Sequence, residues 1–285
     1  MNILLVGVFD SSYRSTNNSQ LRCLMDLGHR VVGYNYRSRA QQLGIKARDQ
    51  HLLESVKSRD FDLVIFSKGN TISFECTKEI SHHTTTCLWW MDPLTTLHSH
   101  PEIIKKASIM GYVCTGIKNT IPVFKEVNKK SFYIPEGYDP YVDNPYDLKK
   151  DLDVVFIGSL HSDREQTLKD LGVPVEHITD AYGKRHAEIV SRAKICLNFS
   201  TADSASDRVY KTLAARGFLM SSDWQNRKDD FADGKDLIIF KDIADLRQKI
   251  DFYLNHEKER GIIAEAGYQK VQKFSRMTWA EKILQ

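Results

Sequence analysis

The sequence predicts an α/β protein built from two Rossmann-like domains, each a parallel sheet covered by helices on both faces, with a helix at the carboxyl end. The prediction rests first on strand-like apolar runs that alternate with helical periodicity along the whole chain. It rests secondly on a proline-rich break at residues 135–150, which divides a chain of 285 residues, enough for about two domains. We expect the two domains to face a cleft.

The first series begins with Ile3–Val8, an uninterrupted apolar run of the kind found in strands that are buried on both faces. The helix expected at 17–27 ends before Gly28, a residue that suits the left-handed end of a helix. Further strands are expected at 30–36, 63–66, 86–91, 110–115 and 131–134, and further helices at 52–59, 71–82, 103–108 and 121–127. The short connections favour an open parallel sheet.

Residues 136–150 are expected to link the domains, because they combine turn signals at Glu136-Gly137 and Asp139-Pro140 with no periodicity. The N-terminal domain then covers 1–135 and the C-terminal domain 151–285. In the second series, strands are expected at 154–157, 195–199, 218–221 and 237–240, helices at 164–171, 186–193, 209–216 and 243–255, and a helical tail from 257 onward.

The composition is that of a water-soluble protein, with 41% hydrophobic and 27% charged residues. No apolar run approaches the ~18 residues of a membrane span, and no signal peptide is evident. The five cysteines are widely spaced and include no C-x-x-C pair, so we expect buried thiols and a cytoplasmic location.

Positive charge is concentrated in the first half, where 19 Lys and Arg face 15 Asp and Glu, against 21 and 22 in the second half. Five cations precede the next acid, with Tyr34 and Tyr36 among them: Arg30, Arg37, Arg39, Lys46 and Arg48. A basic stretch with interleaved aromatic residues can bind a polyanion such as DNA, and it can equally be a solvated helix–loop face.

Open parallel sheets bind ligands beyond the carboxyl ends of their strands. Asp92 lies at such an end, after Trp89-Trp90-Met91 and before Pro93. Two indoles would desolvate its carboxylate and raise its basicity, so Asp92 is the first candidate for a general base, and Asp10 is the second. For both residues a turn role is the alternative. Other polar residues at these ends are Lys68, Gly69, Asn70, Gly158, Ser159, Ser200, Thr201 and Asp223.

Ser206–Met220 places Arg208 at the start of an apolar helix, which Gly217 ends before the next strand. Helix N-termini favour anions through their free N–H groups and the helix dipole. The turn at Gly158-Ser159 leads to a second cationic helix start, Arg164. Two such starts in one domain suit a diphosphate, although each arginine alone could be an ordinary surface residue.

These segments resemble the GT-B glycosyltransferases, in the branch related to the spore-maturation glycosyltransferases. Residues 206–220 resemble the donor-binding element, 158–165 the G-S-x-H-x-x-R-E element and 89–93 a W-x-x-D-P motif. The resemblance covers the whole chain and is most specific at 153–278. It implies a nucleotide diphosphate-sugar donor, such as a UDP-sugar, bound by Gly158, Ser159, Arg164, Asp207, Arg208, Tyr210 and Asp223. It also implies an acceptor near Arg37, Arg39, Lys68 and Asn70, with Asp92 or Asp10 as the base.

We expect no cofactor and no metal. Two D-x-D sequences, 60–62 and 151–153, lie before strands, at the edge of the sheet opposite to the ligand edge. His82, His83, His98 and His100 lack a Cys or carboxylate at a recognised zinc spacing. Arginines would then carry the metal's role of stabilising the leaving diphosphate. The absence of Walker-type and G-x-G-x-x-G sequences argues against nucleotide hydrolases and dehydrogenases.

One departure from the family pattern concerns Lys211, where many relatives have a glutamate that accepts hydrogen bonds from the donor. Lysine cannot accept a hydrogen bond, so Asp207 would have to substitute or the donor would be held differently. A GT-B-fold nucleotide-sugar epimerase and a non-catalytic nucleotide-sugar-binding protein therefore remain alternatives. Some phage GT-B enzymes glycosylate hydroxymethylated bases in DNA, so DNA is one candidate acceptor beside small molecules, glycans and proteins.

Overall fold

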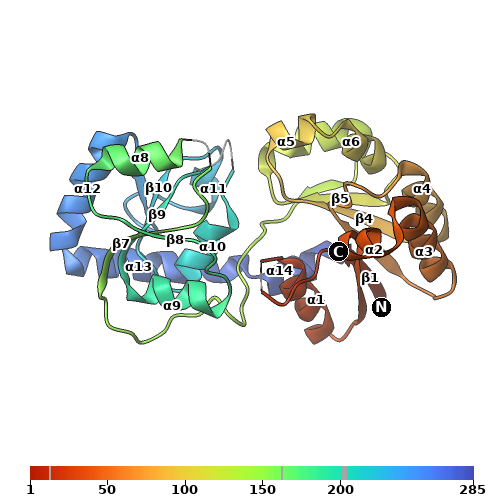
Figure 1. Ribbon diagram of the computed structural model, residues 1–285, viewed down its shortest axis with the longest axis horizontal. Coiled ribbons are helices and arrows are strands. Elements are labelled where there is room, and N and C mark those ends of the chain that lie inside the picture. The colour runs from red at the N-terminus through yellow and green to blue at the C-terminus, as the bar shows by residue number, and fades with distance from the viewer. Residues whose placement is uncertain (13, 162, 201–203) are drawn as a thin grey trace. The chain divides into compact units, whose positions relative to one another are not determined.

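The structure is a computed structural model that describes residues 1–285 except 13, 162 and 201–203. It divides into two compact units, of which the first contains Met1–Glu136 and Arg276–Gln285 and the second Gly137–Ser275. Each unit is built on one sheet with parallel strands (Figure 1). The segment expected as a linker is packed within the second unit, where Tyr138 N–H donates to the carbonyl oxygen of Phe274 over 3.1 Å.

The first unit has a six-stranded sheet in the order β2-β1-β3-β4-β5-β6. The strands are β1 (Asn2–Gly7), β2 (Arg30–Asn35), β3 (Leu63–Ser67), β4 (Thr85–Trp90), β5 (Tyr112–Thr115) and β6 (Ser131–Tyr133). The strand order reverses between β1 and β3, so the loops after these two strands diverge at the topological switch point. Doubly wound sheets bind ligands at that point.

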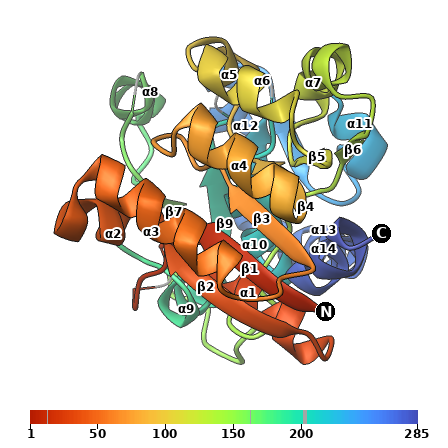
Figure 2. The same ribbon diagram turned by 90° about the vertical axis from the view of Figure 1, so that its right-hand side faces the viewer.

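One face of this sheet is covered by α2 to α7, as Figure 2 shows for α3 and α4. These helices are α2 (Tyr36–Leu43), α3 (Ile45–Lys57), α4 (Phe74–His83), α5 (Leu94–His98), α6 (Pro101–Ala107) and α7 (Ile121–Val127), with a 3₁₀ turn at Lys118–Thr120. Their apolar sides meet Leu4, Phe66 and Trp90, which project to this face.

The other face carries α1 (Asn17–Asp26) and α14 (Arg276–Ile283), which pack against each other. Trp279 meets Trp89 edge to face at 5.5 Å between ring centroids, and Tyr112 Oη donates to the carbonyl oxygen of Ile283 over 2.7 Å. Residues 276–285 therefore belong to the first unit, whereas the sequence places them in the second domain.

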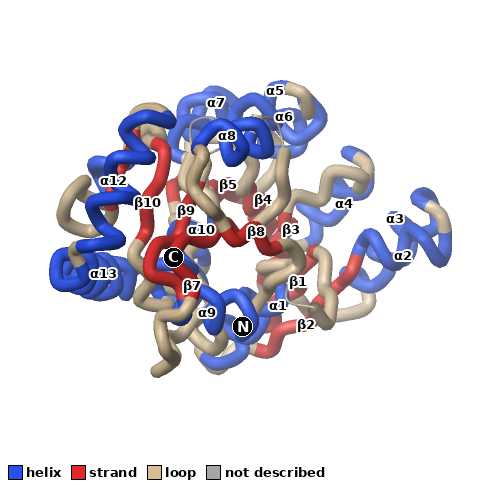
Figure 3. Tube along the Cα trace, turned by 60° about the vertical axis from the view of Figure 1, so that its left-hand side comes forward, coloured by secondary structure: helices blue, strands red, loops and turns tan. Residues whose placement is uncertain are grey.

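The second unit has a five-stranded sheet in the order β11-β10-β9-β7-β8. Its strands are β7 (Leu152–Ile157), β8 (Glu176–Ile178), β9 (Ala193–Asn198), β10 (Leu219–Ser222) and β11 (Ile238–Phe240). Its helices are α8 (Arg164–Leu171), α9 (Lys184–Arg192), α10 (Asp207–Ala214), α11 (Arg227–Asp230), α12 (Ile243–Asn255) and α13 (Glu257–Val271), followed by a 3₁₀ turn at Gln272–Phe274. The alternation of strands and helices is visible along the trace in Figure 3.

The two faces of this second sheet have separate cores. Phe156 and Leu197 pack with residues of α8 and α12, and Val155 and Cys196 pack with residues of α9. Because successive side chains of a strand alternate between faces, this pattern fixes which side chains of β7 and β9 are buried under which helices. Among the described residues, no helix is both long and apolar enough to cross a membrane.

Candidate functional site

Arg208 stands in the first turn of α10, beyond the carboxyl ends of β7 and β9. Its Nη1 donates to Asn198 Oδ1 over 2.9 Å, and its guanidinium carbon lies 5.1 Å from the centre of the Phe156 ring. Asn198 is fully buried at the end of β9, and its amide nitrogen donates to Ser221 Oγ over 2.9 Å. The side-chain oxygen of Asn198 is thereby directed at Arg208, so the guanidinium is held in one place.

Arg164 is the first residue of α8, and its guanidinium carbon lies 5.8 Å from the same Phe156 ring. It donates to the carbonyl oxygens of Ser159 over 3.1 Å and Phe199 over 2.9 Å. Burial lowers the pKa of Arg208 to about 10; the neighbouring Asp207 opposes this shift and Arg164 adds to it. A guanidinium whose charge is disfavoured by burial and by a second cation marks a position where an anion would be stabilised.

Gly158 directly follows β7 and has a φ of 145°, a value that side-chain-bearing residues rarely adopt. A Cβ at this position would lie 2.3 Å from Arg208 Nη2. The Gly158 carbonyl oxygen lies 2.8 Å from His177 Nε2, and the His177 ring stacks on Phe156 at 5.8 Å. The glycine is therefore needed for the close approach of arginine to backbone.

Three further donor-site candidates have partners of their own. Asp207 forms an ion pair with Lys211 one turn further along α10, so an acid accompanies the lysine that departs from the family pattern. Tyr210 is buried in a core with Phe231 and Phe274. Asp223 accepts hydrogen bonds from Arg227 and Trp224 N–H, and its pKa is lowered chiefly by the bond from Arg227. Ser159 is exposed.

His186 in α9 was not among the expected site residues. Its side chain is buried, and within the described part of the chain neither ring nitrogen has a hydrogen-bond partner. Burial lowers the pKa of His186 to about 3, and the charge of Lys211 adds to the shift. The imidazole is therefore neutral at physiological pH beneath the charged first turns of α10.

In the first unit, Asp92 lies beyond the carboxyl end of β4 and is bound by Lys68 from the loop after β3. Lys68 Nζ lies 2.6 Å from Asp92 Oδ1, and the Asp92 side chain is 25% exposed. The two indoles are fully buried, and Trp90 Nε1 donates to the backbone oxygen of Asp92 over 2.8 Å. The Trp90 indole therefore fixes the backbone at Asp92, while the carboxylate has the Lys68 ammonium group as its neighbour.

Asp10, the second candidate base, organises the loop after β1. Its carboxylate accepts hydrogen bonds from the Ser12 hydroxyl and from the N–H groups of Ser12, Arg14 and Ser15. Burial acts to raise the pKa of Asp10, but these hydrogen bonds together outweigh burial and lower it. Such a carboxylate is a poor proton acceptor, which argues against Asp10 as the general base.

In the basic stretch at 30–48, four of the five cations are exposed and the fifth is buried. Arg37 and Arg39 project from α2 into solvent, as do Arg30 and Lys46 on neighbouring elements. Arg48 is fully buried and donates to the carbonyl oxygens of Tyr36 and Thr71 over 2.9 and 2.6 Å. Tyr34 and Tyr36 are also buried, so neither ring is available to stack on a ligand.

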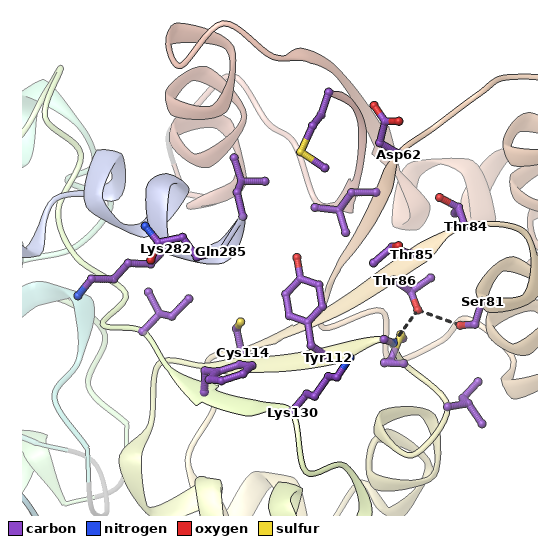
Figure 4. Close-up of a pocket in the computed structure, with 18 of the residues that line it drawn as sticks. Asp62, Ser81, Thr84, Thr85, Thr86, Tyr112, Cys114, Lys130, Lys282 and Gln285 are labelled. Carbon is purple, nitrogen blue, oxygen red and sulfur yellow. Dashed lines mark hydrogen bonds between the residues drawn. The ribbon is translucent and has the colours of Figure 1, made fainter.

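A hollow of about 1200 Å³ lies at the amino ends of β3, β4 and β5, the edge of the sheet opposite to Asp10, Lys68 and Asp92 (Figure 4). Several of its polar groups are already bonded to one another, including Thr86 with Ser81 over 3.0 Å. The hollow is therefore separate from the candidate site.

The acidic residues of the two D-x-D sequences lie at the amino ends of the strands, where they bind neighbouring groups of the same sheet edge. Asp62 accepts from Asn2 N–H over 2.6 Å, and Asp151 and Asp153 form ion pairs with Arg192 and Lys194. Among the described residues no group of three or more His, Cys, Asp or Glu side chains is arranged to hold a metal ion. Ser162 of the 158–165 element and Thr201 of the loop after β9 lie outside the described residues.

Comparison with known proteins bears on this geometry. Residues 145–285 match the family described as glycosyl transferase-like. A search among curated proteins gave no match.

Several solved structures match this chain over nearly its whole length. Anabaena HepE in complex with UDP-glucose has a TM-score of 0.74 at 10% identity, covering 100% of this chain and 98% of HepE. A glycosyltransferase from Rickettsia africae has a TM-score of 0.70 at 12% identity, with 99% and 96% covered. An alpha-glucosyltransferase in complex with UDP-glucose and DNA containing an abasic site has a TM-score of 0.69 at 10% identity, with 99% and 97% covered.

The expected GT-B fold and the expected enzyme class, a glycosyltransferase, are confirmed. The spore-maturation branch and the role of each site residue stay predictions.

Proposed function

We propose that this glycosyltransferase transfers a sugar from a UDP-sugar to a hydroxyl group of an acceptor without the help of a metal ion. The observation that carries the proposal is the pair of guanidinium groups, Arg164 and Arg208, that lie over the Phe156 ring beside the Gly158 turn. Two structures of the same fold, Anabaena HepE and the alpha-glucosyltransferase, contain UDP-glucose, which supports UDP as the nucleotide.

The chemistry of transfer requires stabilisation of the departing diphosphate. When the bond between the anomeric carbon and the phosphate oxygen breaks, negative charge develops on that oxygen. Arg208 and Arg164 would stabilise this charge from positions fixed in advance by Asn198 and by the carbonyl groups of Ser159 and Phe199. Charge-assisted hydrogen bonds from arginine suit phosphate oxygens particularly well.

On the first unit, Asp92 would accept the proton of the acceptor hydroxyl if the reaction inverts the anomeric centre. If the configuration is retained, Asp92 would instead position the acceptor. Lys68, whose Nζ lies 2.6 Å from Asp92 Oδ1, would orient the carboxylate in either case.

For the acceptor we propose a hydroxymethylated base in DNA. Arg37 and Arg39 are exposed on α2 and could contact phosphates, and the structural relative with bound DNA has the same fold. Small molecules, glycans and proteins are the competing acceptors.

The proposal is tested by incubating the protein with UDP-glucose and other UDP-sugars, with and without hydroxymethylated duplex DNA, in the presence of EDTA. Release of UDP that depends on the acceptor and survives EDTA is the expected result. Conversion of the donor sugar without an acceptor would indicate an epimerase, and UDP binding without any turnover would indicate a binding protein. Loss of transfer in EDTA that manganese restores would refute metal independence.

A further inference from the structure

The loop after β3 has a strained turn at its centre. Lys68 has a φ of 64° and Gly69 a φ of 67°. Gly69 N–H donates to the carbonyl oxygen of Ser67 over 2.9 Å, which closes a three-residue turn around Lys68. A lysine pays for this left-handed conformation, and such strain persists only where the surroundings impose it. Here the turn brings Lys68 Nζ to Asp92.

Two buried cations impose the turn from other helices. Lys106 in α6 is 3% exposed, and its Nζ donates to the carbonyl oxygens of Gly69 over 2.9 Å and Asn70 over 3.3 Å. Arg48 in α3 is fully buried and donates to the next carbonyl oxygen, that of Thr71. Three consecutive carbonyl groups are thus bound by two cations whose burial is itself unfavourable.

We propose that Lys106 is a positioning residue for sugar transfer: by holding the carbonyl groups of Gly69 and Asn70 it keeps Lys68, and through it Asp92, in place for the acceptor. This inference rests on the proposed function. In an inverting transfer, the acceptor oxygen bonds to the anomeric carbon, the proton of the acceptor hydroxyl passes to Asp92, and the bond from that carbon to the diphosphate breaks. Lys106 neither gives nor takes a proton in this step.

The hold of Lys106 depends on its charge, because hydrogen bonds from an ammonium group are stronger than those from a neutral amine. The charged or titratable groups that face Lys106 are Glu102 on its own helix, Asp49 and Arg48 on α3, and Cys76 on α4. Burial lowers the pKa of Lys106 to about 8, and Glu102 and Asp49 oppose the shift. The turn should therefore loosen above pH 8, within the range of an ordinary assay.

The test compares Lys106→Met with Lys105→Met. Lys105 is the adjacent residue of the same helix and is exposed, with its Nζ 4.1 Å from the centre of the Phe74 ring. At pH 7 we expect Lys106→Met to lower kcat by tenfold or more with the donor KM within twofold of wild type, and Lys105→Met to change neither. The decline of wild-type kcat above pH 8 should persist in Lys105→Met and be absent in Lys106→Met.

Hydrogen exchange gives a readout that does not require activity. Protection of the amides of Lys68, Gly69 and Ile72 should fall about tenfold in Lys106→Met and stay unchanged in Lys105→Met. If the wild type transfers no sugar, the proposed function fails, while exchange still decides whether Lys106 holds the turn. If Lys106→Met does not fold, the same amides are compared in the wild type at pH 7 and pH 9, and their protection should fall at pH 9, where Lys106 is neutral. Unchanged protection, or a kcat within twofold of wild type, overturns the inference.

Discussion

Arg208 occupies the space that a side chain at position 158 would need, since a Cβ built on Gly158 would lie 2.3 Å from Arg208 Nη2. A side chain at position 158 would therefore displace the Arg208 guanidinium from where the structure holds it, although the two residues lie about fifty positions apart in the sequence.

We expect Gly158→Ala to weaken UDP binding. The methyl group displaces the Arg208 guanidinium, and the loss of a charge-assisted contact costs about 1.5–3 kcal/mol, or roughly ten- to hundredfold in Kd. Gly172→Ala is the matched control, because Gly172 also has a positive φ, 65°, and an arginine beside it, Arg247. Calorimetry that finds equal UDP affinity in the two variants would show that the fit between Gly158 and Arg208 has no role in binding.

Arg208→Ala should also weaken UDP binding by about 1.5–3 kcal/mol while the protein stays folded, because one of two cations near the diphosphate is lost. Arg192→Ala removes an exposed arginine from the same unit, where it binds Asp151 at the amino edge of the sheet. That control should bind UDP like wild type. An unchanged Kd for Arg208→Ala, measured by calorimetry, would place the diphosphate elsewhere.

Asp92→Asn should abolish most of the transfer, since asparagine keeps the size of the side chain but cannot take a proton at neutral pH. A general base contributes about 10²–10⁴-fold to the rate. UDP affinity should not change. Asp60→Asn, an exposed acid before β3, is the control and should transfer normally. If Asp92→Asn transfers sugar at an initial rate near that of wild type, the Asp92 carboxylate is not the general base and Asp10 is the next candidate.

His186 predicts a loss of stability in acid. Its pKa is about 3 in the folded protein, below the ordinary 6.5, so the unfolded chain binds the proton first as the pH falls. The free energy of unfolding should therefore decrease from pH 6.5 toward pH 3, by about 1.4 kcal/mol per pH unit from this residue.

Urea unfolding at pH 7, 5.5 and 4.5 measures this slope. His186→Phe should reduce it, whereas His161→Phe, at an exposed histidine, should not. Parallel slopes in wild type and His186→Phe would mean that His186 is not kept neutral by burial.

Arg37 and Arg39 should account for part of any DNA affinity. Log Kd changes with log salt by about 0.9 per phosphate contacted, so Arg37→Ala with Arg39→Ala should flatten the slope by up to about two units. Lys57→Ala with Arg59→Ala, at two exposed cations elsewhere in the first unit, is the control. If wild type binds no duplex DNA at low salt, DNA is excluded as the acceptor while sugar transfer to another acceptor remains testable.

The alternation of strands and helices and the parallel sheets could be predicted because buried parallel strands are apolar throughout, whereas the order of the strands within each sheet comes from the structure. The run Ile3–Val8 leaves few alternatives to a central strand, and the order of the later runs fixes a parallel arrangement. The placement of Arg208 at a helix start was predictable for the same kind of reason, since an apolar helical pattern begins directly after it.

Buried polar residues were the part that sequence could not reveal. Arg48 looks like one cation among five, yet it is fully buried: it forms an ion pair with the adjacent Asp49 and donates to the carbonyl oxygens of Tyr36 and Thr71, which come together only in the fold. Lys106 donates to the carbonyl oxygens of Gly69 and Asn70, and Asn198 bonds to the side chains of Arg208 and Ser221, and neither arrangement can be read from the sequence. Tyr210 differs from these residues: the sequence makes it a candidate for binding the donor because it lies close to Arg208, and in the structure its ring packs in the core.

The return of residues 276–285 to the first unit has a consequence for biosynthesis. The second unit is continuous in sequence, so it can complete its fold as soon as Ser275 has left the ribosome. The first unit is made earlier, but its sheet keeps one face without α14 until Trp279 and Ile283 emerge. We therefore expect the half that is synthesised first to reach its native state last, with Trp89 dependent on a chaperone or on transient contacts in the interval.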